Sequence, residues 1–535
     1  MRNKWKTILS TMVVFLFVFI GSGILFVKFA WFSMTMEEML FHIKTSLTGA
    51  SASVVNEYLL ASILPTLLVT ALYAILAGLG NKLARPLKWL AAAFCLVALI
   101  VGAYSFHLWT FLRGQFVSST YIEDNYVDPK TVDLQFPEKK RNLIYIYLES
   151  MEMTYADKES GGAFDKNVIP ELTLLAKENE DFSGNEYSLS RTDTPDNLLS
   201  RKEDLKSFQT LNSHIPDGSD YSEENDDEER GMLTVQNSND KLNGGYAVED
   251  TTWTMAAMFG QTSGLPLKIP MGQNQMVYVN KFMPGVTSLG DILEENGYHN
   301  VLMIGSNATF GGRRKYFQQH GDYEICDWPW AKKEGLIPSN YKVWWGYEDE
   351  KLFQYAEDKL TDLAAENQPF NFTMLTVDTH FEDGHSCRLC PSDNGDNKYA
   401  NVMHCSSQQV VRFVHWIQDQ DFYDNTTIII SGDHPTMDKD FCNDIDENYQ
   451  RKVYTCIVNA PISPMDGERR REFTTLDMFP TTLAAMNVKI PGDRLGMGTN
   501  LYSTEDTLAE KDGVDKINEE ITYKSALMRT LYDGN

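Results

Sequence analysis

The chain has 535 residues, 43% of them hydrophobic, and a formal net charge of −27 with a pI near 4.8. A surface this acidic repels phosphate backbones, so the composition excludes a nucleic-acid partner. An acidic exterior favours solubility and attracts divalent cations.

Three apolar segments in the first 112 residues are each long enough to cross a bilayer, which takes about 20 helical residues. They are residues 8–28, 57–80 and 88–112, and they predict a transmembrane anchor over residues 1–115. A cleaved signal peptide is the alternative for the first segment. Two further spans and the lack of a clear small-residue cleavage site argue against it.

Basic residues predict how the anchor is oriented. They precede the first segment and fill the loop between the second and third, as Arg2, Lys4, Lys6, Lys82, Arg85 and Lys88. Because positively charged loops stay in the cytoplasm, we expect a cytoplasmic N-terminus in a multi-pass protein. Everything after residue 112 is then extracytoplasmic.

After a linker over residues 116–139, strand and helix patterns alternate and predict an α/β domain over residues 140–505. The predicted strands are short, apolar and rich in β-branched or aromatic residues: 142–148, 300–304, 370–377, 426–430 and 452–459. The predicted helices carry apolar residues at three- and four-residue spacing: 169–179, 288–296, 350–365, 408–418 and 475–486. This order predicts a mostly parallel sheet sandwiched by helices, with ligands at the carboxyl ends of its strands.

Two polar segments lie outside this alternation. Residues 184–242 include the acidic run 217–230, which cannot bury enough apolar surface to offset chain ordering and predicts a flexible surface insertion. A lid or a cation-gathering flap is the alternative role for it. Residues 506–535 predict a charged C-terminal tail or a peripheral helix.

Cysteine placement agrees with the predicted topology. Cys95 lies within the third span, and the other six are extracytoplasmic: Cys326, Cys387, Cys390, Cys405, Cys442 and Cys456. An even number in an oxidising compartment favours disulfides, with 15 possible pairings. Zinc ligation by Cys387, Cys390 and Cys405 is the alternative, although the surrounding Ser, Asp, Asn and Gly are typical of a surface loop.

Candidate metal ligands follow two of the predicted strands. Glu149 comes directly after the first strand, and Asp433 and His434 come after the fourth. Two carboxylates and an imidazole suit Mn²⁺, Mg²⁺ or Zn²⁺, and we expect one divalent cation with Mn²⁺ preferred. Each residue alone also has a structural interpretation as a cap or a salt-bridge partner.

Thr254 is the candidate nucleophile. It lies near the start of a predicted helix after Asp250, where free N–H groups favour an incoming phosphate. A threonine hydroxyl is a weak nucleophile, and coordination to a divalent cation would lower its pKa. In the alternative interpretation Thr251, Thr252 and Thr254 are all helix-cap residues.

Seven short motifs occur in a fixed order along residues 140–503. They are Leu148-Glu149-Ser150, Thr252-Trp253-Thr254-Met255-Ala256, Trp345-Gly346-Tyr347-Glu348-Asp349-Glu350, Asp378-Thr379-His380, Gly432-Asp433-His434, Thr475-Leu476-Asp477-Met478-Phe479-Pro480 and Arg494-Leu495-Gly496-Met497-Gly498-Thr499-Asn500-Leu501. Together they resemble the phosphoglycerol transferase I and lipoteichoic acid synthase-like branch of the sulfatase/alkaline phosphatase superfamily. The resemblance implies an alkaline phosphatase/sulfatase-like fold and a bacterial inner membrane location with a periplasmic catalytic domain.

The resemblance also implies residue roles. Glu149, Thr254, Asp433 and His434 match the metal ligands, with Thr254 also the nucleophile. Four further residues match or flank substrate-binding positions: His380, Asp378, Arg313 and Trp345. Asp378 is expected to orient the ring of His380. The alternatives are a loop histidine without a ligand for His380 and a solvated basic turn for Arg313.

The implied reaction moves phosphoglycerol from phosphatidylglycerol to a glycan through a covalent threonine intermediate and releases diacylglycerol. Two segments depart from the family pattern, the acidic insertion and the cysteine-rich loop over residues 386–405. The acceptor is therefore open among periplasmic glucan, lipopolysaccharide and capsule. A phosphoethanolamine transferase is the enzymatic alternative, and an inactive membrane-bound assembly protein is the alternative of another class.

Overall fold

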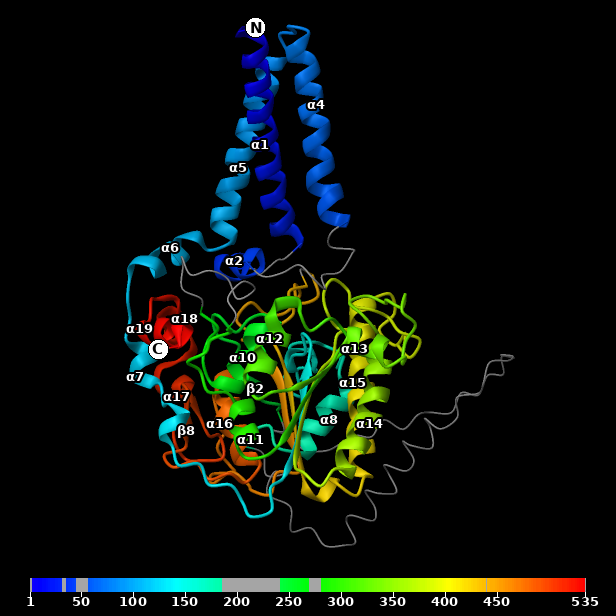
Figure 1. Cartoon of the computed structure of the whole chain (residues 1–535), viewed down its shortest axis with the longest axis vertical. Coiled ribbons are helices and arrows are strands. Elements are labelled where there is room, and N and C mark those ends of the chain that lie inside the picture. Colours follow the sequence, from blue (N-terminus) through cyan, green and yellow to red (C-terminus); the bar gives the residue numbers. More distant parts are fainter. Residues whose placement is uncertain are drawn as a thin grey trace, which may run out of the picture.

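The computed structural model describes residues 2–30, 35–44, 56–184, 241–268, 281–438 and 440–534. Three long helices project from a larger α/β domain (Figure 1). Nearly all of the predicted acidic insertion, residues 185–240, lies outside the described residues.

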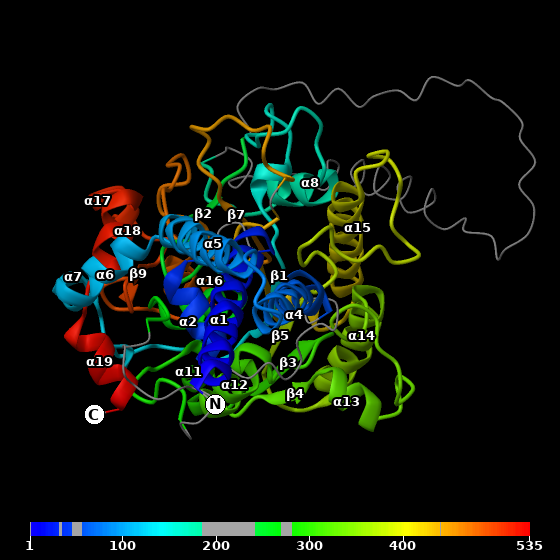
Figure 2. The ribbon, with the colours of Figure 1, turned by 90° about the horizontal axis from the view of Figure 1, so that it is seen from above.

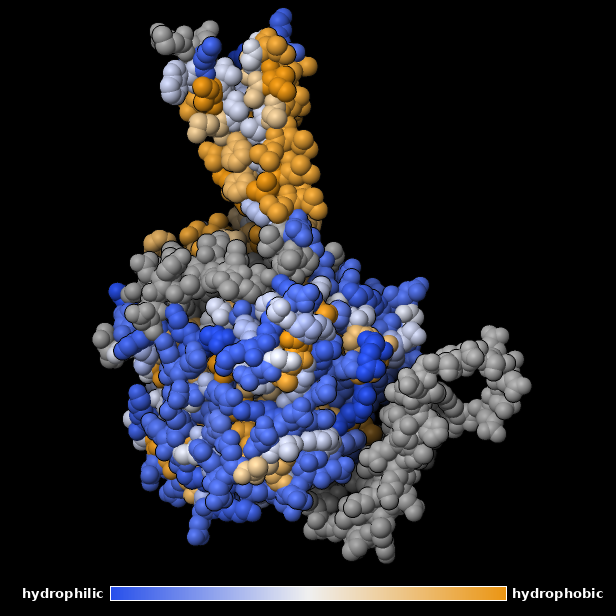
Figure 3. All heavy atoms as spheres, turned by 45° about the vertical axis from the view of Figure 1, so that its right-hand side comes forward, coloured by the Kyte–Doolittle hydropathy of each residue, from blue (hydrophilic) through white to orange (hydrophobic). Residues whose placement is uncertain are grey.

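The projecting helices form the anchor. α1 (Arg2–Ala30), α4 (Leu64–Gly78, preceded by a π-helical turn) and α5 (Ala84–Ser105) belong to three stretches that are long and apolar enough to span a membrane. Their outer surfaces are hydrophobic, in contrast to the hydrophilic domain (Figure 3). Ser22 holds α1 to its neighbour through the hydroxyl groups of Ser62 and Thr66, at 3.0 and 3.3 Å.

The third helix ends earlier than the predicted span. α5 stops at Ser105, because His107 adopts a left-handed conformation with φ of 50°. A separate helix, α6 (Leu108–Phe116), then runs sideways beneath the anchor beside the short α2 (Met36–Lys44) (Figure 1). The apolar residues up to 112 therefore belong to two helices rather than to one span.

A seven-stranded sheet forms the centre of the domain, in the order β2-β7-β6-β1-β5-β3-β4. Its strands are β1 (Asn142–Leu148), β2 (Gly244–Gly245), β3 (His299–Ile304), β4 (Glu324–Cys326), β5 (Phe370–Leu375), β6 (Thr426–Gly432) and β7 (Val453–Val458). β1 pairs with β5 and β6 in parallel, and β7 is antiparallel to β6. Each of the five predicted strands is present, and the predicted α/β fold class is confirmed.

Helices cover both faces of the sheet (Figure 2). On one face lie α10 (Thr254–Ser263), α11 (Leu289–Glu295), α12 (Arg313–Gln319) and α16 (Met478–Ala485), and on the other α8 (Pro170–Glu178), α14 (Asp349–Ala365) and α15 (Lys398–Gln418). Alternate residues of β1 enter the two cores, with Tyr145 on the first side and Ile146 on the second. Because both faces are buried, β1 is apolar along its length.

The charged C-terminal segment forms part of the domain. It folds into α17 (Leu508–Asp512), α18 (Val514–Thr522) and α19 (Ala526–Asp533), which bury Ile517 and Ile521 in the first core. The linker packs on these helices, since Glu123 in α7 (Tyr121–Asn125) accepts hydrogen bonds from the start of α19. The anchor is thus connected to the domain through a packed segment.

Candidate active site

Three candidate ligands meet at the carboxyl ends of β1 and β6. These strands are parallel neighbours, with Leu148 opposite Gly432, so the residues that follow them lie side by side. His434 Nε2 lies 3.6 Å from Glu149 Oε1 and 3.4 Å from Asp433 Oδ2. One ligand atom from each of the three lies within 4.8 Å of the others, and all three residues are buried.

Local hydrogen bonds aim these side chains. Asp433 Oδ1 accepts hydrogen bonds from the N–H groups of Ser150 and His434, both at 2.8 Å. Gly432 lets the end of β6 pack closely against the segment after β1, because a Cβ at this position would lie 1.9 Å from the carbonyl oxygen of Met151. Within the described parts of the chain, Asp433 Oδ2 is buried without a hydrogen-bond partner, an arrangement that suits a cation ligand.

The His434 ring is oriented in the same way. Its Nδ1 donates to the carbonyl oxygen of Pro435 at 2.9 Å, which leaves the lone pair of Nε2 facing the two carboxylates. Asp433 Oδ2 and Glu149 supply hard oxygen atoms beside it. The donor set therefore fits a divalent cation.

The electrostatics of the three residues also favour a cation. Burial raises the pKa of Asp433 to about 7, and the charge of Glu149 adds to this rise. Burial alone would raise the pKa of Glu149, but the nearby imidazoles of His380 and His434 outweigh it and lower that pKa. Burial of two adjacent carboxylates thus favours the protonated form of one of them, and a bound cation would allow both to ionise.

Thr254 lies beside this set. It is the first residue of α10, and its Oγ1 lies 3.3 Å from Glu149 Oε2 and 3.5 Å from His434 Nε2. The first N–H groups of a helix have no intrahelical acceptor, so they can bind a phosphate oxygen here. Thr251 is buried and donates to the carbonyl oxygen of Val248 at 2.7 Å, which gives it a structural role.

His380 lies on the loop after β5. Its Nδ1 donates to the carbonyl oxygen of Phe381 at 2.7 Å, and its ring packs on Trp345 with centroids 4.7 Å apart. Burial lowers the pKa of His380, although the charge of Glu149 opposes this shift. His380 therefore presents a neutral ring with Nε2 available to a ligand.

Asp378 does not orient His380, contrary to the expectation from sequence. Its Oδ2 accepts from the N–H of Asp349 at the start of α14, at 3.1 Å, and Asp349 accepts from the N–H of Asp378 in return. The carbonyl oxygen of Phe381 holds the ring instead. Asp378 therefore ties the loop after β5 to α14.

Arg313 is buried, with 6% of its surface exposed, so it does not form a solvated turn. Its guanidinium donates to the carbonyl oxygens of Phe310 and Asn307, at 3.1 and 3.3 Å. Burial lowers the pKa of Arg313 to about 10, with the charges of Glu149 and Asp433 opposing the shift. It stays positively charged at neutral pH, near the carboxylates.

Three further residues help to form the site. Thr376 Oγ1 accepts from the N–H of Glu149 at 3.0 Å, and Thr379 Oγ1 donates to its carbonyl oxygen at 2.6 Å. Burial lowers the pKa of His434, but Asp433 and Glu149 together raise it, and the charge of Glu38 in α2 adds to the rise. The segment between anchor and domain thus approaches the site.

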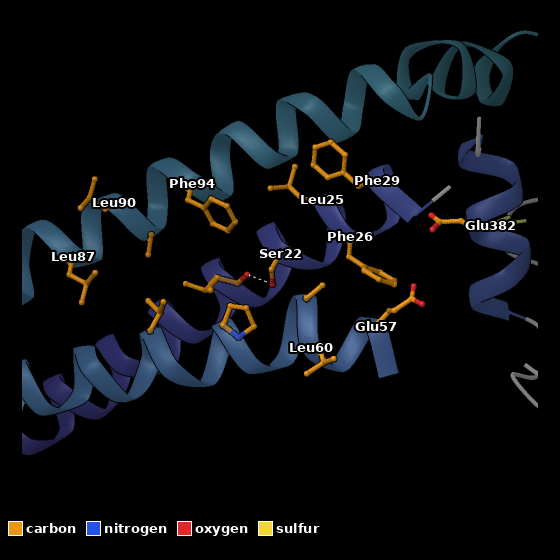
Figure 4. A pocket seen from close by; sticks show the side chains of 15 residues that line it. Ser22, Leu25, Phe26, Phe29, Glu57, Leu60, Leu87, Leu90, Phe94 and Glu382 are labelled. Carbon is orange, nitrogen blue, oxygen red and sulfur yellow. Dashed lines mark hydrogen bonds between the residues drawn. The ribbon is translucent and has the colours of Figure 1, made fainter. Parts of the chain in front are cut away.

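A cavity of about 860 Å³ opens between α1, α4 and α5. Its walls are mostly apolar, with Leu87 and Leu90 toward one end and the carboxylates of Glu57 and Glu382 toward the other (Figure 4). Glu382 lies two residues after His380. The cavity therefore extends from the membrane-spanning helices to the loop that carries His380.

The pair Asp349 and Asp378 predicts a pH dependence of stability. Burial raises the pKa of Asp349 to about 7, and burial with the Asp349 charge raises that of Asp378 well above its usual value. Such carboxyls stabilise the fold fully below their unfolded pKa, about 4, and lose this contribution as pH rises through the folded value. Between about pH 5 and about pH 8 we expect thermal melts to lose on the order of 2 kcal/mol of unfolding free energy. Asp378→Asn should flatten this slope, and an unchanged slope would contradict the assignment.

Residues 242–488 match the family model described as Sulfatase. This match confirms the resemblance to the sulfatase/alkaline phosphatase superfamily that the motifs predict. It is similar to phosphoglycerol transferase I of Escherichia coli O139:H28, with 26% identity over 448 residues that cover 82% of this chain and 49% of the relative. The chain thus spans about half the length of the curated relatives it matches.

The solved structures to which the chain is similar include two bacterial proteins. One is a protein of the alkaline phosphatase superfamily from Vibrio parahaemolyticus, with 16% identity, coverage of 72% of this chain and 76% of that chain, and a TM-score of 0.47. The other is the lipoteichoic acid synthase LtaP from Listeria monocytogenes, with 15% identity, coverage of 72% and 82%, and a TM-score of 0.42.

Proposed function

We propose that this protein is a membrane-anchored, divalent-metal-dependent transferase that moves phosphoglycerol from phosphatidylglycerol to a cell-surface glycan. The observation that carries the proposal is the contact of the Thr254 hydroxyl with the ligand set of Glu149, Asp433 and His434. Similarity to phosphoglycerol transferase I supports the transferred group.

Glu149, Asp433, His434 and Thr254 would hold the cation, with Mn²⁺ preferred. A bound divalent cation lowers the pKa of a coordinated hydroxyl and neutralises charge on phosphoryl oxygens. Two observations support this assignment: Asp433 Oδ2 has no hydrogen-bond partner among the described residues, and His434 Nε2 faces the two carboxylates.

The reaction has two displacements at phosphorus. In the first, Thr254 Oγ1 attacks the lipid phosphorus, the bond to diacylglycerol breaks, and the threonine proton ends on the diacylglycerol hydroxyl. In the second, an acceptor hydroxyl attacks the glycerophospho-threonine and Thr254 regains a proton. The α10 N-terminus and Arg313 stabilise phosphoryl charge, and His380 binds the headgroup.

The anchor cavity supports a lipid donor. Its apolar walls suit acyl chains, and its position beside the loop of His380 would bring a lipid headgroup toward Thr254. Holding the lipid in this way raises its effective concentration at the nucleophile. We also propose that the protein lies in the bacterial inner membrane, with the cytoplasmic N-terminus that its basic residues predict and the domain on the periplasmic side.

The donor assay that tests this proposal measures diacylglycerol release by the full-length protein from vesicles of phosphatidylglycerol or phosphatidylethanolamine. We expect release with Mn²⁺ from phosphatidylglycerol. Release from phosphatidylethanolamine alone would replace the proposal with a phosphoethanolamine transferase.

A larger side chain that fills the cavity should raise KM for a long-chain lipid. Ala61 lines the cavity, and Ala61→Trp should raise KM for long-chain phosphatidylglycerol by on the order of tenfold. KM for a short-chain, water-soluble analogue should change little. Leu68→Trp is the matched control, because Leu68 is 62% exposed on the outer face of α4. Equal effects of both variants on both lipids would contradict the lipid role of the cavity.

A further inference from the structure

Three cysteines gather beside the active-site loop. Cys387 and Cys390 lie between β5 and α15, and Cys405 lies within α15. The Sγ atom of Cys387 is 3.8 Å from that of Cys390 and 3.7 Å from that of Cys405, and all three sulfurs lie within 4.8 Å of one another. The cluster is separate from the residues proposed to hold the catalytic cation.

These distances fit a shared metal ion. Sulfur atoms bound tetrahedrally to Zn²⁺ at about 2.3 Å lie about 3.8 Å apart, whereas disulfide sulfurs are about 2.05 Å apart. All seven cysteines lie in described residues, and none of them is joined to another by a disulfide in this structure. The disulfides expected from sequence thus stay a prediction, and the spacing favours the zinc alternative for these three.

Neighbouring N–H groups point at two of the sulfur atoms, as donors do around cysteine thiolates. The N–H of Leu389 points at Cys387 Sγ at 3.4 Å, and the side-chain amide of Gln409 points at Cys405 Sγ, also at 3.4 Å. Such donors stabilise negative sulfur and orient metal ligands. Cys456, by contrast, contacts the carbonyl oxygen of Leu175 in α8 and takes no part in the cluster.

We propose that Cys387, Cys390 and Cys405 bind one Zn²⁺ as thiolates, with solvent as fourth ligand, at a structural site distinct from the catalytic one. Three S–Zn bonds form, and three thiol protons pass to solvent. The ion fastens the loop after His380 to α15. Other bonds already join the same segments, since Tyr399 OH donates to the carbonyl oxygen of Thr379 at 2.7 Å and Lys398 Nζ to that of Gly384 at 2.8 Å.

The test measures metal per chain in full-length protein by elemental mass spectrometry. We expect one zinc that a brief chelator wash leaves in place, and its loss in Cys405→Ser. Cys442→Ser is the matched control and should keep the zinc, because Cys442 lies outside the cluster. Equal zinc in Cys405→Ser and the unmodified chain would overturn the proposal.

Two further measurements use the unmodified chain, so their outcome does not depend on whether a variant folds. Replacement of zinc by Cd²⁺ should give the ultraviolet absorption of cadmium thiolates with three sulfurs per ion. Peptide mass spectrometry after alkylation under denaturing conditions should find all three cysteines as thiols. A disulfide between any two of them would overturn the proposal.

The site also predicts a selective kinetic effect. If zinc fixes the loop that carries His380, Cys405→Ser should raise KM for the lipid several-fold while the catalytic site keeps its own cation. Unchanged KM in a zinc-free variant would remove the positioning role. Because zinc content is measured directly, failure of this proposal is distinguishable from failure of the proposed transferase activity.

Discussion

Thr254→Ala is expected to lower phosphoglycerol transfer by on the order of 10⁴-fold or more, because the variant lacks the attacking oxygen. Thr254 Oγ1 is the hydroxyl that contacts both Glu149 and His434. The measurement is diacylglycerol release from phosphatidylglycerol vesicles. The variant should still bind part of its metal through the three remaining ligands.

Two variants control this prediction. Thr254→Ser keeps a hydroxyl and should retain part of the activity, whereas Thr252→Ala removes a neighbouring hydroxyl and should stay within a few-fold of the unmodified chain. If Thr254→Ala turned over normally and Thr252→Ala did not, the nucleophile would be Thr252.

Asp433→Asn is expected to remove the catalytic cation and to lower activity by on the order of 10³-fold. The substitution takes away the charge of a buried carboxylate whose Oδ2 has no hydrogen-bond partner in the part of the chain that the structure describes. The backbone bonds that Oδ1 accepts from Ser150 and His434 need one oxygen atom, which asparagine also supplies. The fold should therefore persist while Mn²⁺ affinity, measured by calorimetry, falls.

A surface aspartate provides the control for this variant. Asp393 is 63% exposed at its side chain and lies outside the site, so Asp393→Asn should bind Mn²⁺ normally. A chelator should abolish the activity of the unmodified chain, and Mn²⁺ should restore it. Full activity in excess chelator, or unchanged Mn²⁺ affinity in Asp433→Asn, would remove the metal assignment.

The proximity of Glu149 to Asp433 and His434 could be predicted, because buried strands are recognisable from their runs of apolar residues. Parallel neighbours end at the same edge, so residues directly after β1 and β6 must lie close together. The place of Thr254 at a helix start followed from local pattern in the same way. These inferences need only secondary structure and topology.

Other features depend on tertiary packing and could not be predicted. The charge of Glu38 acts on His434 because α2 lies between anchor and domain, and nothing in the local sequence specifies that placement. Asp378 is two residues from His380, but its side chain contacts α14 instead of the ring. The left-handed residue His107 breaks an apolar run that hydropathy alone treats as continuous.

The most direct test of the proposed function is mass spectrometry of the full-length protein after incubation with phosphatidylglycerol and Mn²⁺ without an acceptor. We predict a glycerophosphate adduct located on Thr254 by peptide analysis, together with released diacylglycerol. The Thr254→Ala variant should show neither. No adduct and no diacylglycerol from the unmodified chain, or an adduct on another residue, would contradict the proposed mechanism.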